Sequence, residues 1–222
     1  MLIREKGYRI GFGNLKEPIV SEFKNWEALK PSWRQTHGVE SAEILAPHQS
    51  CGDVDALYTL QKNTPISVVT ADCVPIIFAS KSKPFASAIH AGWKGTRAQI
   101  SKQVLQKISV QKMIEPEELI AWIGPAIGPC CYEVSEEMIS DFSAYFSRFD
   151  VKKFIPSHRH LDLQTLNQLD LQALGVNDIR VIRECTKCTV TDPSQAQSKS
   201  WKYASYRREG SGVRQFSTIQ ID

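Results

Sequence analysis

A cysteine and a histidine stand at the ends of two strongly apolar runs in the middle of the chain. Cys73 precedes the run 74–79, and His90 follows the run 85–89. Apolar runs of this length, separated by Lys-Ser-Lys-Pro, predict two buried strands joined by a short turn. Rigid strands hold side chains more precisely than loops do, so a thiolate and an imidazole at these strand ends could share one ligand.

A third partner must come from another part of the chain. His37 lies beside Gly38 between two possible strands and is a candidate ligand, although a plain turn residue is the alternative. Asp53 and Asp55 are two residues apart, so in an extended chain both would point to one face and could orient a ligand or act as a base. The alternative for the two aspartates is a solvated turn.

The other cysteines predict no metal site by themselves. Cys130 and Cys131 are adjacent, and we expect their side chains to point apart, which argues against a shared metal ion. The CTKC segment, residues 185–188, could be half of a zinc knuckle or a redox dithiol, but the second pair that a structural zinc site normally has is missing. We therefore expect these cysteines to be reduced and structural.

Helices and strands must both contribute to positioning these residues. Helical spacing of apolar side chains predicts a helix from Thr96 to about residue 108, a second after Ser135, and a third from Asp162 to Gly175. Strands are predicted over 117–124 and around 179–182, and a terminal strand pair within 201–220. The sequence predicts a layered, mixed α+β fold, with mixed sheets flanked by helices, in a single domain over residues 1–222.

Composition excludes several function classes. The 222 residues carry a net charge of only +3, so a nucleic-acid partner is not expected. An apolar leader and a membrane-spanning run are both absent from the sequence, which predicts a cytoplasmic protein with no membrane partner. Dinucleotide-binding, phosphate-loop and serine-hydrolase motifs are also absent.

Six motifs taken together resemble one family. They are QTHG (35–38), DVDAL (53–57), TADCVPI (70–76), HAGWKGT (90–96), IGPAIGPCCYEV (123–134) and SYRR (205–208). In this order they look like the YfiH-like family, also labelled multicopper polyphenol oxidoreductase or laccase-domain proteins. The resemblance implies a layered fold and one zinc ion held by His37, Cys73 and His90. It also implies phosphorolysis of purine nucleosides (adenosine, inosine, guanosine and methylthioadenosine) and adenosine deaminase activity.

The chain departs from the family pattern at its front, where a Ser-Thr-Arg segment and an Asn-Arg helix are not evident. Other cations must then hold phosphate, and the candidates are Lys94 and Arg207, with Arg offering the planar fork that suits phosphate. The alternative for the SYRR segment is a solvated strand end. The candidate proton shuttles are Asp72, next to Cys73, and Asp53 or Asp55, because zinc-activated water that attacks adenine needs a neighbouring carboxylate.

The sequence leaves three rival functions open. Five histidines are too few for a multicopper oxidase, although a single copper in place of zinc is conceivable. A cysteine-type hydrolase of peptidoglycan precursor editing would use Cys73 as nucleophile and His90 as base. A non-enzymatic, zinc-stabilised binding protein is the third possibility.

Overall fold

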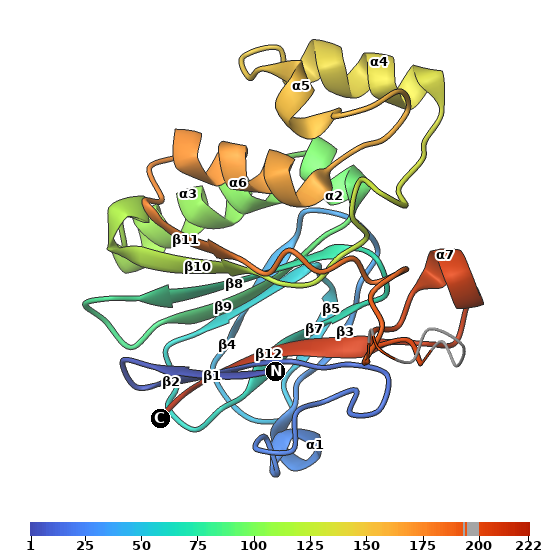
Figure 1. Ribbon diagram of the computed structural model, residues 1–222. Coiled ribbons are helices and arrows are strands. Elements are labelled where there is room, and N and C mark those ends of the chain that lie inside the picture. Colours follow the sequence, from blue (N-terminus) through green and yellow to red (C-terminus); the bar gives the residue numbers. More distant parts are fainter. Residues whose placement is uncertain (193, 195–199) are drawn as a thin grey trace.

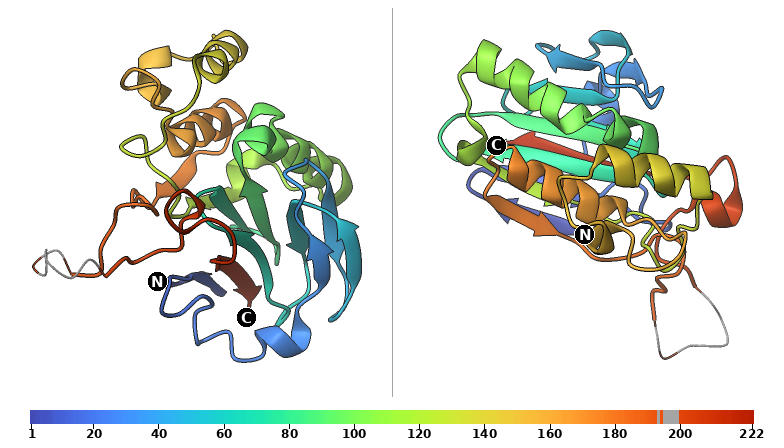
Figure 2. Two further views of the ribbon diagram at one scale, coloured as in Figure 1. Left: turned by 90° about the vertical axis from the view of Figure 1, so that its right-hand side faces the viewer. Right: turned by 90° about the horizontal axis from the view of Figure 1, so that it is seen from above.

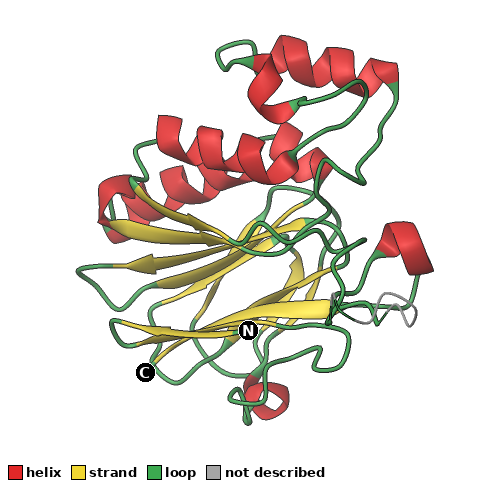
Figure 3. Ribbon diagram, in the orientation of Figure 1, coloured by secondary structure: helices red, strands yellow, loops and turns green. Residues whose placement is uncertain are grey.

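The protein, seen in a computed structural model that describes residues 1–192, 194 and 200–222, is built in layers (Figure 1). Within these residues the strands form a six-stranded sheet of order β11-β10-β8-β9-β6-β4, a four-stranded sheet of order β1-β2-β12-β7, and the pair β3-β5. Helices α2, α3 and α6 cover the outer face of the six-stranded sheet, and the four-stranded sheet lies against its other face (Figures 1 and 3). The view from above in Figure 2 shows the helical cover.

The strands are β1 (Leu2–Glu5), β2 (Tyr8–Phe12), β3 (Ser32–Arg34), β4 (Ser41–Ile44), β5 (Ser50–Asp53), β6 (Ala56–Thr59), β7 (Ile66–Thr70), β8 (Val74–Ser80), β9 (Ala86–Ala91), β10 (Leu119–Ile123), β11 (Asp178–Val181) and β12 (Gln215–Ile221). The helices are α1 (Trp26–Leu29), α2 (Trp93–Arg97), α3 (Ile100–Lys112), α4 (Glu136–Tyr145), α5 (Val151–Phe154), α6 (Leu163–Ala173) and α7 (Tyr206–Glu209), with a 3-10 turn at Pro116–Glu118.

The apolar runs around Cys73 and His90 form the centre of the six-stranded sheet. Alternate side chains of β8 point to opposite faces: Ile76 and Phe78 pack under the helices, and Ile77 and Ala79 pack against the four-stranded sheet. Because both faces are covered, β8 and β9 are buried along their whole length. The two predicted strands and their antiparallel turn are therefore confirmed.

The predicted layered, mixed α+β architecture is also confirmed. Parallel pairs (β10 with β11, β4 with β6) and antiparallel pairs (β8 with β9 and with β10) coexist in the larger sheet. Helices α4 and α6 begin as expected, since Ser135 accepts a hydrogen bond from the Met138 N–H and Asp162 accepts one from the Thr165 N–H. Within the described ranges, every helix is too short or too polar to span a bilayer.

Two predicted elements differ from the structure. The helix expected from Thr96 is broken, because Gln99 adopts a left-handed conformation (φ 55°) between α2 and α3. The terminal strand pair is wrong: SYRR forms the short helix α7, and β12 pairs with β2 and β7. The polar segment 192–200, whose sequence suggests a loop, lies largely outside the described residues.

Candidate functional site

The topology of β8 and β9 brings Cys73 and His90 to one edge of the sheet. Val74 pairs with Ala91, so the residue before β8 lies beside the end of β9. His37 reaches the same place from the loop between β3 and β4, and its Nε2 lies 3.9 Å from the Cys73 Sγ. One potential ligand atom from each of His37, Cys73 and His90 lies within 4.8 Å of the others.

Gly92, which directly follows β9, leaves the room for this approach. A Cβ atom at this position would lie 2.9 Å from His37 Cδ2 and 3.1 Å from Cys73 Sγ. Such contacts are too short for ordinary packing, so only glycine allows both side chains to sit over the backbone here.

Asp55 organises two of the three residues. Its buried carboxylate accepts hydrogen bonds from the backbone N–H groups of Thr36 (3.1 Å), His37 (2.9 Å) and Gly38 (2.7 Å). It also lies 2.7 Å from Nδ1 of His90. The three converging N–H groups stabilise the turn in which His37 has a left-handed φ of 62°.

The electrostatics of the metal-free site follow from these contacts. Burial opposes ionisation of Asp55, but the hydrogen bonds from His90 and the turn lower its pKa to about 2. Burial also opposes protonation of His90, and its hydrogen bonds to Asp55 and Cys73 raise its pKa to about 9. Burial acts against the Cys73 thiolate as well, yet its hydrogen bonds to the two histidines lower its pKa to about 7.

The donor set fits one tetrahedral zinc ion. With Zn–N near 2.1 Å and Zn–S near 2.3 Å, ligand atoms should lie about 3.6 Å apart in a regular tetrahedron, close to the 3.9 Å between Cys73 Sγ and His37 Nε2. Because Nδ1–H of His90 donates to Asp55, its Nε2 lone pair is left for a metal, an arrangement common behind metal-binding histidines.

Gln35 was not predicted from the sequence to serve the site. Its side-chain amide donates to the Val69 carbonyl (2.8 Å), and its side-chain oxygen accepts from the Val69 N–H (2.7 Å). The side chain thus pairs with the edge of β7 as a short strand would, and it fixes the loop that carries His37. Its position two residues before His37 in the QTHG motif was the available signal.

A cleft of about 1200 Å³ opens beside the three residues. Its walls include many aromatic and cationic side chains, among them Trp26, Trp33, Trp93, Tyr132, Tyr206, Phe216, Lys30, Arg34, Arg207 and Arg214. Rings and fixed positive charges are the groups that bind planar bases and phosphate. Lys30 and Arg34 were not anticipated, since they come from sequence without a clear pattern.

Of the two predicted phosphate ligands, Arg207 lines the cleft and Lys94 does not. The Arg207 guanidinium lies over the Tyr132 ring, 5.0 Å from its centroid, and donates to the Glu133 carbonyl (3.0 Å). Arg208 instead donates to the carbonyl oxygens of Thr186 and Lys187, so it supports a loop.

Asp72 lies within the lining but its carboxylate is committed to three hydrogen bonds. It accepts from Thr186 Oγ1 (2.6 Å), Ser205 Oγ (3.1 Å) and the Arg207 backbone N–H (2.7 Å). These contacts tie the end of β7 to two distant loops.

Asp53 and Asp55 do not share one face of a strand as predicted. Strand β5 ends at Asp53, which forms an exposed ion pair with Arg34 (2.5 Å), whereas Asp55 is buried before β6 begins. The extended pattern stops between them, because the backbone N–H of Val54 donates to the Arg34 carbonyl and that of Asp55 to the Glu40 carbonyl.

Sequence comparisons agree on one family. Residues 22–222 match the family model described as "Multi-copper polyphenol oxidoreductase laccase". The chain is 33% identical over 206 residues to a protein of Clostridium acetobutylicum named purine nucleoside phosphorylase, covering 90% of this chain and 81% of that one. It is 31% identical over 195 residues to the purine nucleoside phosphorylase YfiH of Escherichia coli, covering 86% and 74%.

Solved structures share the fold. YlmD from Geobacillus stearothermophilus superposes with a TM-score of 0.78 at 24% identity, over 97% of this chain and 92% of that chain. The hypothetical protein YfiH of Bacillus licheniformis gives 0.78 at 23% identity, over 97% and 93%. From the motifs, the fold and these matches together, the chain belongs to the YfiH-like family of laccase-domain proteins.

Proposed function

We propose that the protein is a zinc-dependent purine nucleoside phosphorylase. The observation that carries the proposal is the convergence of His37, Cys73 and His90, with Asp55 behind them, at the wall of a cleft lined by aromatic rings and arginines. Relatives at about one-third identity that are named purine nucleoside phosphorylases support it.

The three residues suit zinc because thiolate and imidazole are its preferred ligands, and three protein ligands leave one coordination position for substrate or solvent. A zinc ion held there supplies a Lewis acid that polarises a substrate oxygen or lowers the pKa of water. Asp55 fixes both histidine ligands, one through its ring and the other through its backbone.

In phosphorolysis, a phosphate oxygen forms a bond to C1′ of the ribose while the bond from C1′ to the purine nitrogen breaks and the departing purine takes up a proton. The chain must bind the phosphate dianion. It must also stack against the purine ring and keep water away from it. We assign the first task to the Arg207 guanidinium and the second to the Tyr132 and Trp93 rings. The carbonyl of Glu133 holds Arg207 in place.

The predicted role of Asp72 as a proton shuttle stays a prediction. Its three hydrogen bonds support a different role, since a carboxylate that accepts from Ser205, Thr186 and the Arg207 N–H is well placed to position Arg207. We propose that Asp72 is a positioning residue.

We also propose that the same cleft deaminates adenosine. A histidine, cysteine, histidine ligand set with an open position is suited to activating water, and attack of water at C6 of adenine releases ammonia. This second activity needs no phosphate, which separates it experimentally from phosphorolysis.

The test measures both activities on zinc-loaded protein. We expect phosphate-dependent release of base from inosine, guanosine, adenosine and methylthioadenosine, and ammonia release from adenosine. Cys73→Ser should lose the zinc ion of this site and both activities. Arg207→Lys should raise KM for phosphate and leave zinc content and deamination near wild type, with the exposed Arg4→Lys as control. Absence of base release from metal-replete protein would remove the phosphorylase proposal, and the additional absence of deamination and of hydrolysis would favour the binding-protein alternative.

One observation favours a second candidate. Cys73, His90 and Asp55 also form a cysteine, histidine and carboxylate arrangement in which a nucleophile, a base and an orienting group are adjacent. A cysteine-type hydrolase acting on peptidoglycan precursors would use it. Chelation separates the two proposals, because the hydrolase should keep its activity without metal and the phosphorylase should lose it.

Phenol oxidation is not expected despite the description of the family model. The chain has five histidines, and two of them, His158 and His160, lie in the loop before α6. Five histidines are too few for several copper centres, although copper could replace zinc in the site of His37, Cys73 and His90. Oxygen uptake with a phenolic substrate by zinc-only protein would contradict this assignment.

A further inference from the structure

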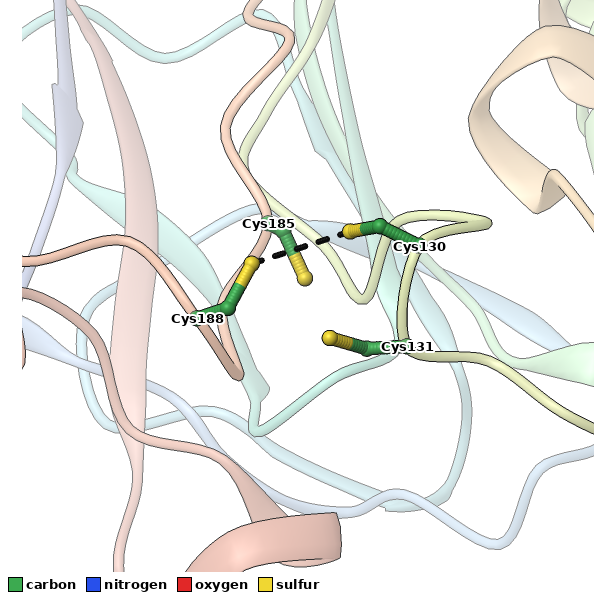
Figure 4. Close-up of side chains that lie close together, drawn as sticks. All are labelled: Cys130, Cys131, Cys185 and Cys188. Atoms are coloured by element: carbon green, nitrogen blue, oxygen red, sulfur yellow. Dashed lines mark hydrogen bonds between the residues drawn. The ribbon is translucent and has the colours of Figure 1, made fainter.

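A second group of metal-ligating side chains lies outside the cleft site. The Sγ atoms of Cys130, Cys131, Cys185 and Cys188 all lie within 4.8 Å of one another. Figure 4 shows the sulfur atoms pointing toward one common centre from two loops. The prediction that Cys130 and Cys131 point apart is therefore wrong, and the second pair that the CTKC segment seemed to lack is the adjacent pair 130–131.

Sheet topology brings the two pairs together across more than fifty residues. β10 and β11 are parallel neighbours with Ile123 opposite Val181, so the loops that follow them leave the sheet at the same edge. A bridge between Ala126 and Cys185 continues this pairing beyond the strands. Cys130 then lies 58 positions from Cys188 in the chain, yet their Sγ atoms are 3.6 Å apart.

The distances suit a tetrahedral ion rather than a disulfide. Zn–S bonds of about 2.3 Å place sulfur atoms about 3.8 Å apart in a regular tetrahedron, and the Cys130 to Cys188 separation is 3.6 Å. A disulfide requires about 2.05 Å between sulfurs. All four cysteines are free thiols in the structure, and Cys130 and Cys188 are exposed.

The surrounding backbone is arranged for a thiolate. The Gly128 N–H donates to the Cys185 Sγ at 3.2 Å, and N–H donors to sulfur are a regular feature around metal-bound cysteines. A Cβ at Gly128 would lie 3.3 Å from Cys185 Cβ and 3.5 Å from Cys130 Sγ, so glycine permits the close approach. Four thiolates this close repel one another unless a cation lies between them.

We propose that Cys130, Cys131, Cys185 and Cys188 bind one zinc ion in a structural, tetrathiolate site separate from the site of His37, Cys73 and His90. Four sulfur ligands complete a tetrahedron, so the ion has no open position and takes no part in the reaction. Binding displaces the protons of the four thiols, and no oxidant or reductant is needed.

The location of the site defines its role. Cys131 is followed by Tyr132, which lines the cleft, and Cys185 is followed by Thr186, which donates to Asp72. An ion at this point joins the loop after β10 to the loop after β11, and so holds both the Tyr132 wall and the partner of Asp72 in place.

Zinc content per chain tests the proposal directly. Protein purified under reducing conditions should hold two equivalents of zinc by elemental analysis. The double variant Cys185→Ser/Cys188→Ser should hold one, Cys73→Ser should hold one, and Cys51→Ser should keep two. Because Cys51 lies outside both groups, it is the matched control. A wild type with one equivalent, lost in Cys73→Ser and kept in the double variant, would overturn the proposal.

Measurements on the wild type keep the test decisive if the double variant does not fold. Native mass spectrometry should find two zinc ions per chain, and alkylation should spare Cys130, Cys131, Cys185 and Cys188 until a strong chelator is added. Bound iron, seen by its visible absorption, or a disulfide, seen as loss of two hydrogens from the intact mass, would also overturn the assignment. The outcome is independent of catalysis, since it does not use an activity assay.

Discussion

At the scale of single residues, Asp55 has the largest influence on the cleft site. One buried carboxylate receives the Nδ1–H of His90 and three N–H groups of the turn that carries His37. The orientation of two proposed zinc ligands on separate segments therefore depends on one side chain that is not itself among the proposed ligands.

We expect Asp55→Asn to weaken zinc binding at this site about 10- to 100-fold, because an amide cannot accept from the imidazole and from all three N–H groups as the carboxylate does. Competition with a chromogenic chelator measures the change. Asp53→Asn is the matched control, since Asp53 lies two residues away in an exposed pair with Arg34 and should leave zinc affinity unchanged. Equal affinities in the two variants would show that Asp55 does not orient the ligands.

Thiol reactivity reports the electrostatics of the same site. In protein from which a chelator has removed the metal, the pKa of Cys73 is about 7, because the neighbouring histidines stabilise its thiolate against the effect of burial. Since the thiolate is the reactive form, alkylation of Cys73 should rise with pH through a midpoint near 7. Burial raises the pKa of Cys51, so that residue should react only at higher pH.

Peptide mapping by mass spectrometry follows both cysteines in one sample. Zinc should abolish the reaction of Cys73 and leave that of Cys51 unchanged. A Cys73 midpoint as high as that of Cys51 would contradict the proposed contact with the histidines.

The types of residue at the cleft site were predictable from the sequence. The residues that their side chains contact were predictable only in part. Cys73 and His90 could be predicted to lie close together because one precedes and the other follows an apolar run, and His37 was a candidate because it stands beside Gly38. Asp55 and Asp53 looked alike in sequence. Their difference arises from tertiary contacts, since one carboxylate meets the end of β9 and the other meets solvent and Arg34.

At the scale of elements, the site depends on the close approach of two segments to the end of β9. A methyl group added at Gly92 would lie 2.9 Å from His37 Cδ2 and 3.1 Å from Cys73 Sγ, which is too close for ordinary packing. The helix that follows, α2, begins at Trp93, which lines the cleft.

We expect Gly92→Ala to displace both ligands and lower kcat/KM roughly 100-fold, in line with the effect of ångström-scale misplacement in active sites. The control is Gly95→Ala, within α2, where a Cβ would have no neighbour closer than 3.4 Å. Steady-state kinetics and zinc content of both variants give the answer. Full activity in Gly92→Ala would mean that the ligands tolerate the added methyl group.

Strands could be predicted from the sequence where the buried apolar run is continuous. The prediction was weaker where tertiary contacts decide the local structure. β8, β9 and β10 follow from apolar runs, and α4 and α6 from their caps. The SYRR segment reads as a strand from its residue types, but the N–H of Arg207 and the hydroxyl of Ser205 bond to Asp72, more than 130 positions away, and the segment turns into α7. The approach of residues 130–131 to residues 185–188 was equally inaccessible, because it depends on the parallel pairing of β10 with β11.

At the scale of the whole molecule, the cleft is assembled from segments that the sheets bring together from distant parts of the chain. Asp72 joins three of them: its own position between β7 and β8, the loop after β11 through Thr186, and the start of α7 through Ser205 and Arg207. The cysteine cluster shares one of these segments, the loop after β11, and connects it to the loop after β10, so the proposed structural zinc and Asp72 hold one wall of the cleft between them.

We expect Asp72→Asn to raise KM for phosphate while zinc content at both sites stays at the wild-type level, because the amide loses charge-assisted hydrogen bonds that position Arg207 but touches no metal ligand side chain. Loss of stability should be about 1–3 kcal/mol, the usual cost of a buried hydrogen-bonding group left with a poorer partner. Urea denaturation and phosphate titrations measure the two effects.

If Asp72 transfers a proton instead, kcat should fall and its pH profile should lose one limb while KM for phosphate is unchanged. A double variant with Arg207→Lys distinguishes the roles further: a positioning role predicts that the two KM effects are not additive, since each variant removes the same contact to phosphate.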